Sequence, residues 1–402
     1  MITSEKALEI ILNHSKKFGE EEIDFINSLG RVLNENIVAD RDFPPFNRVS
    51  MDGIAIVFSE FERGRRTFAI ENIQAAGAAQ KRLQNKENCI EVMTGSILPK
   101  NVDTVIPYEL VEIKEGKATT KVAQLNYNQN VHNQAKDKKM KDLLISSGTL
   151  ISSAEIGVLA TVGKYKIKVA KNPKVMIIST GDELVDINEI PLPYQIRRSN
   201  SYTLASLLAR VHIKASITHI TDDKLVLKQK IKQLLKDYDV LLFSGAVSKG
   251  KYDFLPEIFE ELEVEKLFHK VKQRPGKPFW FGVKKKGKTS LGTVVFAFPG
   301  NPVSTFVGCV KYFYPWIKKS LNLAYINQQK AILSQDYTFK PALTYFLQVK
   351  VENKKGVLYA TPIAGNGSGD LANLIFATAF LELPNNRTNF KKGEVFPVIE
   401  YR

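Results

Sequence analysis

Apolar residues near the start of the chain recur on one helical face. They run from Ala7 to Leu12 after a Thr-Ser pair that can cap a helix, so the pattern predicts a docking helix within residues 3–19. A second helix is predicted to begin at Ser152, where two hydroxyl residues precede Glu155 as in a capping box.

Two parts of the chain have the alternating pattern of β-strands. Between about 50 and 130, short runs such as GIAIVF and RTFAIENI are separated by Gly, Asn and Lys, which predicts a small β-rich domain. From about 326 the chain is again strand-like, as in YFLQVKV and GVLYATPI, and this pattern predicts a small β barrel or sandwich.

The region from about Lys174 differs, because its apolar runs are continuous. KVMIIST, VLLFSG and TVVFAFPG each end in a turn of small residues and are followed by helix-forming sequence. Continuous runs indicate strands buried on both sides, so we expect a parallel sheet with helices on both faces. The fold class is therefore α/β plus β, with several domains.

Composition and charge narrow the classes of function. The 402 residues exceed what one core usually supports, and no stretch approaches the roughly 18 apolar residues of a membrane span. The N-terminal sequence is typical of a cytosolic chain, and Cys89 and Cys309 are predicted to be buried small hydrophobic residues rather than a disulfide or zinc ligands.

The net charge of +15 has three interpretations: nucleic-acid binding, a generally basic surface, or anionic small substrates. Residues 266–288 contain nine Lys or Arg and no acid. Within them Arg274 and Lys277 flank a Pro-Gly turn beside apolar residues, so these two are the best placed to meet an anionic ligand.

Three loops follow the predicted parallel strands, and ligands of such sheets bind outside the carboxyl ends of the strands. Each loop also has a structural interpretation, as a helix cap or a turn. The candidate binding residues in these loops are Ser179, Thr180, Gly181, Ser244, Gly245, Ser248, Pro299, Gly300 and Pro302.

The other polar residues of this region are of the kinds that bind a polyanionic ligand together with Mg²⁺. Ser199 and Asn200 open a predicted helix, whose N-terminus favours an anion. Glu183, Asp253 and also Asp182 are candidate Mg²⁺ ligands. The chain has neither a Walker A sequence nor a serine nucleophile elbow, so a phosphate-bearing ligand is expected without a covalent intermediate.

Seven motifs occur in an order that resembles the MoeA family of molybdopterin molybdenumtransferases, which includes the E domain of gephyrin. They are PPFNRVSMDGIA, MTGSILP, STGDEL, RRSNSYTL, SGAVSKGKYD, RPGKPFWFG and FPGNPVS. The resemblance implies a four-domain subunit that forms a homodimer. The implied domains are 1–45 with 135–172 (I, docking and dimerisation), 46–134 (II, inserted and β-rich), 173–325 (III, α/β and molybdopterin-binding) and 326–402 (IV, small β barrel).

The same resemblance implies a Mg²⁺-dependent reaction in which molybdate is inserted into adenylylated molybdopterin and AMP is released. Its active site would lie between domain III of one subunit and domain II of the other. Matching positions carry over as catalytic residues: Asp52, Thr94, Asp137, Glu183 and Asp253. Arg274 and Lys277 would bind phosphate or molybdate, Pro299 and Pro302 would shape the pocket, and Ser368 matches a serine of domain IV. The adenylyltransferase of the same pathway is a further possible partner.

Some positions depart from the family pattern. Ala135 and Ala246 stand where glycine is common, a mild change if the backbone φ is negative. Leu343 and Gln348 stand where basic residues are common, and Lys350 could compensate for them.

Three other functions compete with the transferase. A scaffold protein would have lost the acids at Asp52, Glu183 and Asp253, which are present. A nucleic-acid-binding protein would need a recognition module, and none is found. A molybdopterin adenylyltransferase would not need residues 1–170 or the C-terminal β domain. The sequence does not distinguish molybdate from tungstate.

Overall fold

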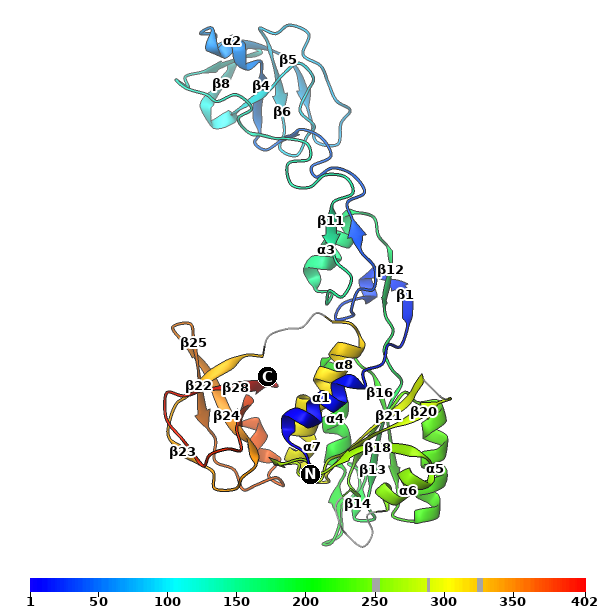
Figure 1. Ribbon diagram of the computed structural model, residues 1–402. Helices are drawn as coiled ribbons and strands as arrows, with labels where there is room; N and C mark the ends of the chain where they lie inside the picture. The colour runs from blue at the N-terminus through cyan, green and yellow to red at the C-terminus, as the bar shows by residue number, and fades with distance from the viewer. Residues whose placement is uncertain (248–253, 288–289, 324–327) are drawn as a thin grey trace. The chain divides into compact units, whose positions relative to one another are not determined.

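The computed structural model describes residues 1–247, 254–287, 290–323 and 328–402 (Figure 1). The chain divides into two compact units. The larger unit consists of Met1–Asn34, Gly148–Ser152 and Lys166–Arg402, and the smaller unit of Glu35–Ser147 and Ser153–Tyr165. None of the described helices is long and apolar enough to cross a membrane.

A six-stranded sheet forms the centre of the larger unit. In spatial order its strands are β16 (Ala215–Ile220), β13 (Val175–Thr180), β17 (Val240–Ser244), β21 (Ser290–Phe298), β20 (Trp280–Lys286) and β18 (Val264–His269). The first four are parallel, which confirms the predicted parallel strands. The other two join through antiparallel pairings, β20 with β21 and β18 with β20, so the sheet is mixed.

Helices cover both faces of this sheet (Figure 1). Both faces of β13 are apolar and therefore need to be covered: Val175 and Ile177 pack into one buried cluster, and Met176 and Ile178 into the other. The first cluster includes α1 (Ser4–Asn13), α4 (Ser199–Arg210), α7 (Pro302–Gly308) and α8 (Tyr314–Ser320). The second includes α5 (Lys224–Asp237) and α6 (Leu255–Glu261).

The predicted N-terminal helix is confirmed as α1. Thr3 caps it by accepting a hydrogen bond from the backbone N–H of Lys6 at 3.2 Å, and Ala7 and Ile11 are fully buried. The chain then continues through a two-stranded ladder of β1 (Glu20–Asp24) and β12 (Lys166–Ala170).

A closed five-stranded barrel ends the larger unit, as the C-terminal pattern predicted. It closes because β24 pairs with both β25 and β26. The strands are β22 (Lys330–Leu333), β24 (Thr344–Lys354), β25 (Val357–Pro362), β26 (Ala379–Leu383) and β28 (Val395–Glu400). The short strand β19 (Gln273–Arg274) joins β24 from the segment between β18 and β20.

Short elements complete the larger unit. They are β14 (Leu184–Val185) with β15 (Ile196–Arg197), β23 (Tyr337–Thr338) with β27 (Asn389–Phe390), the 3-10 helices η1 (Phe25–Asn27) and η4 (Ala372–Ile375), and the π-helical segment η3 (Cys309–Phe313) between α7 and α8.

The smaller unit contains a second six-stranded sheet. Its order is β7 (Thr104–Pro107), β4 (Gly53–Ile56), β6 (Cys89–Val92), β5 (Thr67–Gln74), β9 (Lys117–Thr120) and β8 (Val111–Lys114). Its further elements are β2 (Ile37–Val38) with β11 (Leu143–Ile145), β3 (Arg48–Val49) with β10 (Val131–His132), α2 (Phe58–Glu62), η2 (Tyr108–Leu110) and α3 (Ser153–Thr161). Cys89, like Cys309 in the larger unit, is free and buried, as predicted.

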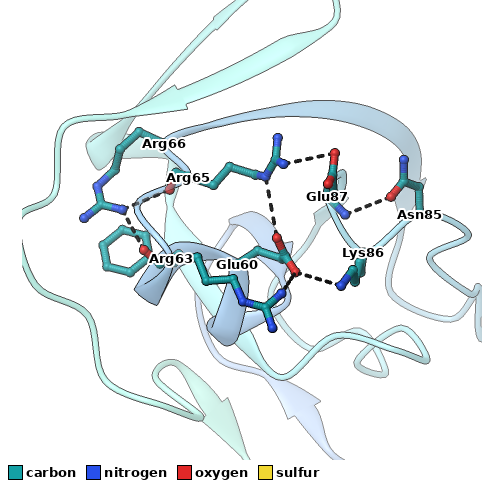
Figure 2. Close-up of polar contacts among 8 residues, drawn as sticks. Glu60, Arg63, Arg65, Arg66, Asn85, Lys86 and Glu87 are labelled. Carbon is teal, nitrogen blue, oxygen red and sulfur yellow. Dashed lines mark hydrogen bonds and ion pairs between the residues drawn. The ribbon is translucent and has the colours of Figure 1, made fainter.

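A buried carboxylate lies beside the sheet of the smaller unit (Figure 2). The side chain of Glu60 is only 5% exposed and contacts three cations: Arg63 at 2.8 Å, Lys86 at 3.4 Å and Arg65 at 3.8 Å. Arg65 also reaches Glu87 at 3.0 Å. Because a buried charge is tolerated only when it is paired, this cluster compensates the desolvation of Glu60.

We therefore expect Glu60→Gln to lower the free energy of unfolding by about 2–3 kcal/mol, because Arg65 and Lys86 would lose their buried counter-charge. Chemical denaturation measures this change. The control is Glu62→Gln, which removes the same charge from an exposed position of α2 and should change stability by less than about 0.5 kcal/mol. Equal effects of the two variants would contradict the explanation.

Candidate functional site

A cavity of about 650 Å³ opens in the larger unit, where the parallel strands β13, β17 and β21 end. The loops that follow these strands and the first turn of α4 form its walls. The predicted site residues that line it are Ser179, Thr180, Gly181, Glu183, Ser199, Asn200, Ser244, Gly245, Pro299, Gly300 and Pro302. The structure thus brings together residues that are more than 120 positions apart in the sequence.

A row of polar side chains crosses the sheet at the edge of this cavity. Ser179 is in register with His219 on β16 and with Ser244 on β17, so the three side chains lie on the same face. The Ser179 hydroxyl and His219 Nδ1 are 3.0 Å apart. Burial, followed by the charge of Arg198, lowers the pKa of His219. The folded protein therefore favours neutral His219 and loses stability as the pH falls below 6.5.

The start of α4 ties two of the loops together. The Asn200 side-chain amide donates to the Ser244 hydroxyl at 2.8 Å and to the Gly300 carbonyl at 2.6 Å. Arg198 precedes the helix, lines the cavity and pairs with Asp186. The free N–H groups of a helix start and a guanidinium favour an anionic ligand group at this end of the cavity.

Polar groups in the cavity wall lack hydrogen-bond partners among the residues that the structure describes. Thr180 and Ser201 are only 4% and 1% exposed, yet neither hydroxyl forms a hydrogen bond with a described residue, and the Asn200 side-chain oxygen is likewise without a partner there. Buried polar groups are normally hydrogen-bonded. These three groups therefore fit a polar ligand in the cavity.

Gly181 lets Glu183 fold back over the end of β13. Its φ is +130°, and a Cβ at this position would lie 2.4 Å from Glu183 Oε2. Any side chain at residue 181 would therefore displace the carboxylate.

The condition under which the two alanines would be mild changes, a negative φ, is not met. Ala246 has a φ of +52° and Ala135 a φ of +60°, both in the left-handed region that favours glycine. Each alanine carries a strain of roughly 1–2 kcal/mol at such a φ. Ala246 lines the cavity directly after Gly245, so this strain lies at the site itself.

Two carboxylates line the cavity, Glu183 and Asp222. Asp182 lies outside the lining, and its side chain accepts the backbone N–H of Asp222 at 3.1 Å. The described residues contain no group of three or more His, Cys, Asp or Glu that could hold a metal ion. A pair of carboxylates still fits Mg²⁺, which keeps several waters and takes other oxygens from substrate phosphates. The predicted residues Ser248 and Asp253 lie outside the described residues.

A second cavity of about 460 Å³ lies between the strand β19 and the barrel. Arg274 and Ser368 line it, together with Tyr337, Tyr345 and Gln348. The neighbouring Asn301, which lines the first cavity, donates to the Ser368 hydroxyl at 2.9 Å. One hydrogen bond thus joins the walls of the two cavities.

Two basic residues, and one of the positions where the family commonly has a basic residue, lie apart from both cavities. Lys277 is exposed and lines neither of them. Leu343 packs against the barrel core, and Lys350 pairs with Glu352 at 2.9 Å. Lys350 also lines neither cavity.

Two predicted catalytic residues of the smaller unit are in contact with each other. Asp52 accepts the backbone N–H of Thr94 at 2.6 Å, and hydrogen bonds from Thr94 hold the pKa of Asp52 below its ordinary value. The following glycine is required for strand packing, because a Cβ on Gly53 would lie 1.9 Å from the Ile106 carbonyl oxygen.

The third predicted residue of the smaller unit, Asp137, pairs with a histidine. His132 Nε2 and Asp137 Oδ1 are 2.9 Å apart, and the side chain of Asp137 is 55% exposed. Its backbone N–H donates to the carbonyl of Phe43 at 2.9 Å.

Sequence reasoning missed His219 and Asp222. Asp222 lies two residues after the end of β16, so the end of that strand was a signal that could have identified it. His219 had no such signal, because its contact with Ser179 depends on β16 being the neighbour of β13.

Comparisons with known proteins cover nearly the whole chain. Residues 2–163 match the MoeA N-terminal region (domain I and II), residues 176–319 a probable molybdopterin binding domain, and residues 330–401 the MoeA C-terminal region (domain IV).

Relatives and solved structures agree with these matches. A molybdopterin molybdenumtransferase of Synechocystis is 41% identical over 99% of both chains, and one of Staphylococcus epidermidis is 30% identical over 99% of this chain and 95% of its own. A molybdopterin biosynthesis MoeA protein of Pyrococcus horikoshii superposes with a TM-score of 0.83 at 29% identity, covering 100% of this chain and 99% of its own.

Proposed function

The chain belongs to the MoeA family and acts in molybdenum cofactor biosynthesis as a molybdopterin molybdenumtransferase, and we propose that it inserts molybdate into adenylylated molybdopterin with hydrolysis and release of AMP. The reaction joins two anions, a phosphate-bearing pterin and an oxyanion. Almost all of the net charge of +15 belongs to the larger unit, which contains both cavities.

The observation that carries this proposal is the first cavity with its unpaired polar groups. Its volume of about 650 Å³ suits a nucleotide-sized or pterin-sized ligand. The hydroxyls of Thr180 and Ser201 would bind polar ligand atoms, and the first turn of α4 with Arg198 would bind phosphate oxygens.

Phosphoanhydride hydrolysis requires positioning of the phosphate and stabilisation of its developing charge. Arg198 and the N–H groups of α4 would supply this stabilisation, and the Ser179 hydroxyl, held by His219, would orient a ligand oxygen. Glu183 and Asp222 would hold Mg²⁺, which when bound neutralises phosphate charge. The sequence adds Asp253 as a third candidate ligand, and this residue lies outside the described residues.

The second cavity would receive the oxyanion. The guanidinium of Arg274 offers a planar pair of donors to a tetrahedral dianion, and the Ser368 hydroxyl lies in the same wall. Lys277 would add charge from the surface nearby. Pro299 and Pro302 would hold the loop of the first cavity against the pterin.

The test supplies adenylylated molybdopterin, molybdate and Mg²⁺ to the purified protein and follows AMP release and metal incorporation together. Coupled AMP release and metal incorporation supports the proposal. Conversion of ATP and molybdopterin into adenylylated molybdopterin would instead identify an adenylyltransferase. Ligand binding without either product would indicate a scaffold.

We also propose that the protein is a cytoplasmic homodimer that receives its substrate from the adenylyltransferase of the pathway. Light scattering should therefore give twice the mass of the 45.2 kDa chain. A monomer that is active in metal insertion would contradict the dimer.

A further inference from the structure

We propose that Tyr312 and Gln273 are positioning residues that hold Arg274 in place for oxyanion binding. They form a buried hydrogen-bonded relay from Ser4 to the turn of residues 274–277, hereafter the basic turn. The inference rests on the proposed function, because it assigns Arg274 to the oxyanion.

The basic turn lines the second cavity and adjoins the first. Arg274 and Pro275 line the second cavity, and the next residue after the turn, Pro278, lines the first. The guanidinium of Arg274 lies 6.0 Å from the ring centre of Phe339. A displacement of this turn would therefore move the cation relative to both ligand sites.

Gln273 holds the basic turn through two side-chain hydrogen bonds. Its side chain is 1% exposed, and its Nε2 donates to the carbonyls of Pro275 at 3.1 Å and Gly276 at 3.4 Å. Gly276 permits this approach, because its φ is +87° and a Cβ there would lie 2.9 Å from Gln273 Nε2. The side-chain amide thus uses both of its donors on the turn.

Tyr312 sets the orientation of that amide. Its hydroxyl donates to Gln273 Oε1 and lies 3.2 Å from the Ser4 hydroxyl, and both Tyr312 and Ser4 are fully buried. Since the phenol has one proton and gives it to Gln273, Ser4 donates to Tyr312. Every polar group of the relay is satisfied, so the amide has one orientation.

The helix that carries Tyr312 has an irregularity at this point. Five residues, Cys309–Phe313, form the π-helical segment η3 between α7 and α8. A π-helical turn contains an additional residue and often occurs at functional sites. Since α7 begins with Pro302 at the wall of the first cavity, the consecutive helical segments α7, η3 and α8, hereafter the helical rod, connect that wall to the relay.

The test compares Tyr312→Phe with Tyr314→Phe in the full-length protein, using the AMP-release assay with molybdate as the varied substrate. Tyr314 is the matched control, because it lies two residues along the same rod and its hydroxyl donates to the Leu207 carbonyl at 2.7 Å, away from the basic turn. We expect Tyr312→Phe to raise the KM for molybdate about tenfold with kcat within about twofold. Tyr314→Phe should leave both constants unchanged.

Arg274→Ala provides the coupling measurement. If Tyr312 acts through Arg274, the double variant should have nearly the same KM for molybdate as Arg274→Ala alone. Two outcomes would overturn the relay and leave the oxyanion assignment of Arg274 intact. In the first, the fold-changes of the two single variants in KM multiply in the double variant. In the second, the KM rises in Arg274→Ala but is unchanged in Tyr312→Phe. An unchanged KM in Arg274→Ala would overturn the oxyanion assignment, and the relay with it.

Should Tyr312→Phe fold poorly, Gln273→Glu tests the same step. It keeps the acceptor for Tyr312 and removes the two donors to the turn, so the KM for molybdate should again rise. A Gln273→Glu protein that folds and has an unchanged KM would also overturn the relay.

Discussion

Glu183→Gln is expected to slow coupled AMP release and metal insertion strongly while adenylylated molybdopterin still binds. Glu183 lines the first cavity and folds back over Gly181, so its carboxylate has a defined position at the strand end. Glutamine has nearly the same shape but is a much weaker ligand for Mg²⁺. We expect kcat to fall by about 10²–10³-fold, because transition-state charge would lose its stabilisation.

Single-turnover AMP release, measured at a series of Mg²⁺ concentrations, checks this expectation. In Glu183→Gln the Mg²⁺ concentration that gives half of the maximal rate should be higher, or the rate should not saturate with Mg²⁺. Glu189→Gln is the control, because it removes the same charge from an exposed position six residues later that does not line the cavity. A Glu183→Gln protein with the wild-type rate and Mg²⁺ dependence would contradict the proposed metal role.

The parts of the fold that were predictable from sequence depend on local patterns. Strand β13 could be predicted because a strand buried on both faces is a continuous apolar run, and the loop after it could be placed at the ligand edge because parallel strands end on the same side. The helix α1 could be predicted from its cap and its one apolar face.

Features that depend on strand order or on backbone conformation could not be predicted. The contact between Ser179 and His219 spans 40 residues and exists because β16 lies next to β13. The contact between Gln273 and Tyr312 spans 39 residues, and Tyr312 lies in the π-helical segment. Positive φ at Ala246 is imposed by the loop around it, against the preference of alanine.

The structure shows how the positive charge of the protein is distributed between its two units. In the smaller unit, cations such as Arg63 and Arg65 pair with acids around Glu60, whereas the larger unit carries almost all of the excess positive charge. This distribution favours anionic small substrates for the larger unit over a basic surface spread along the whole chain.

Asp52→Asn is the second substitution with a large expected effect. Asn keeps an oxygen that can accept the Thr94 N–H, so the loop should keep its structure while the negative charge is lost. If Asp52 acts in the reaction, kcat should fall by about 10²-fold with an unchanged melting temperature. Since Thr94 holds the pKa of Asp52 below 3.8, the wild-type protein should lose activity through Asp52 only below that pH.

Asp103→Asn separates a catalytic role from a structural one. Asp103 lies in the same unit and accepts the backbone N–H of Phe58 at 2.8 Å, so both variants remove a carboxylate that binds a backbone amide. Asp103→Asn should keep full activity, with at most a slightly lower melting temperature. Equal loss of activity in both variants would show that Asp52 acts through the stability of its unit, and full activity of Asp52→Asn would remove it from the reaction. Loss of activity in Asp52→Asn alone would support a catalytic role for the Asp52 carboxylate.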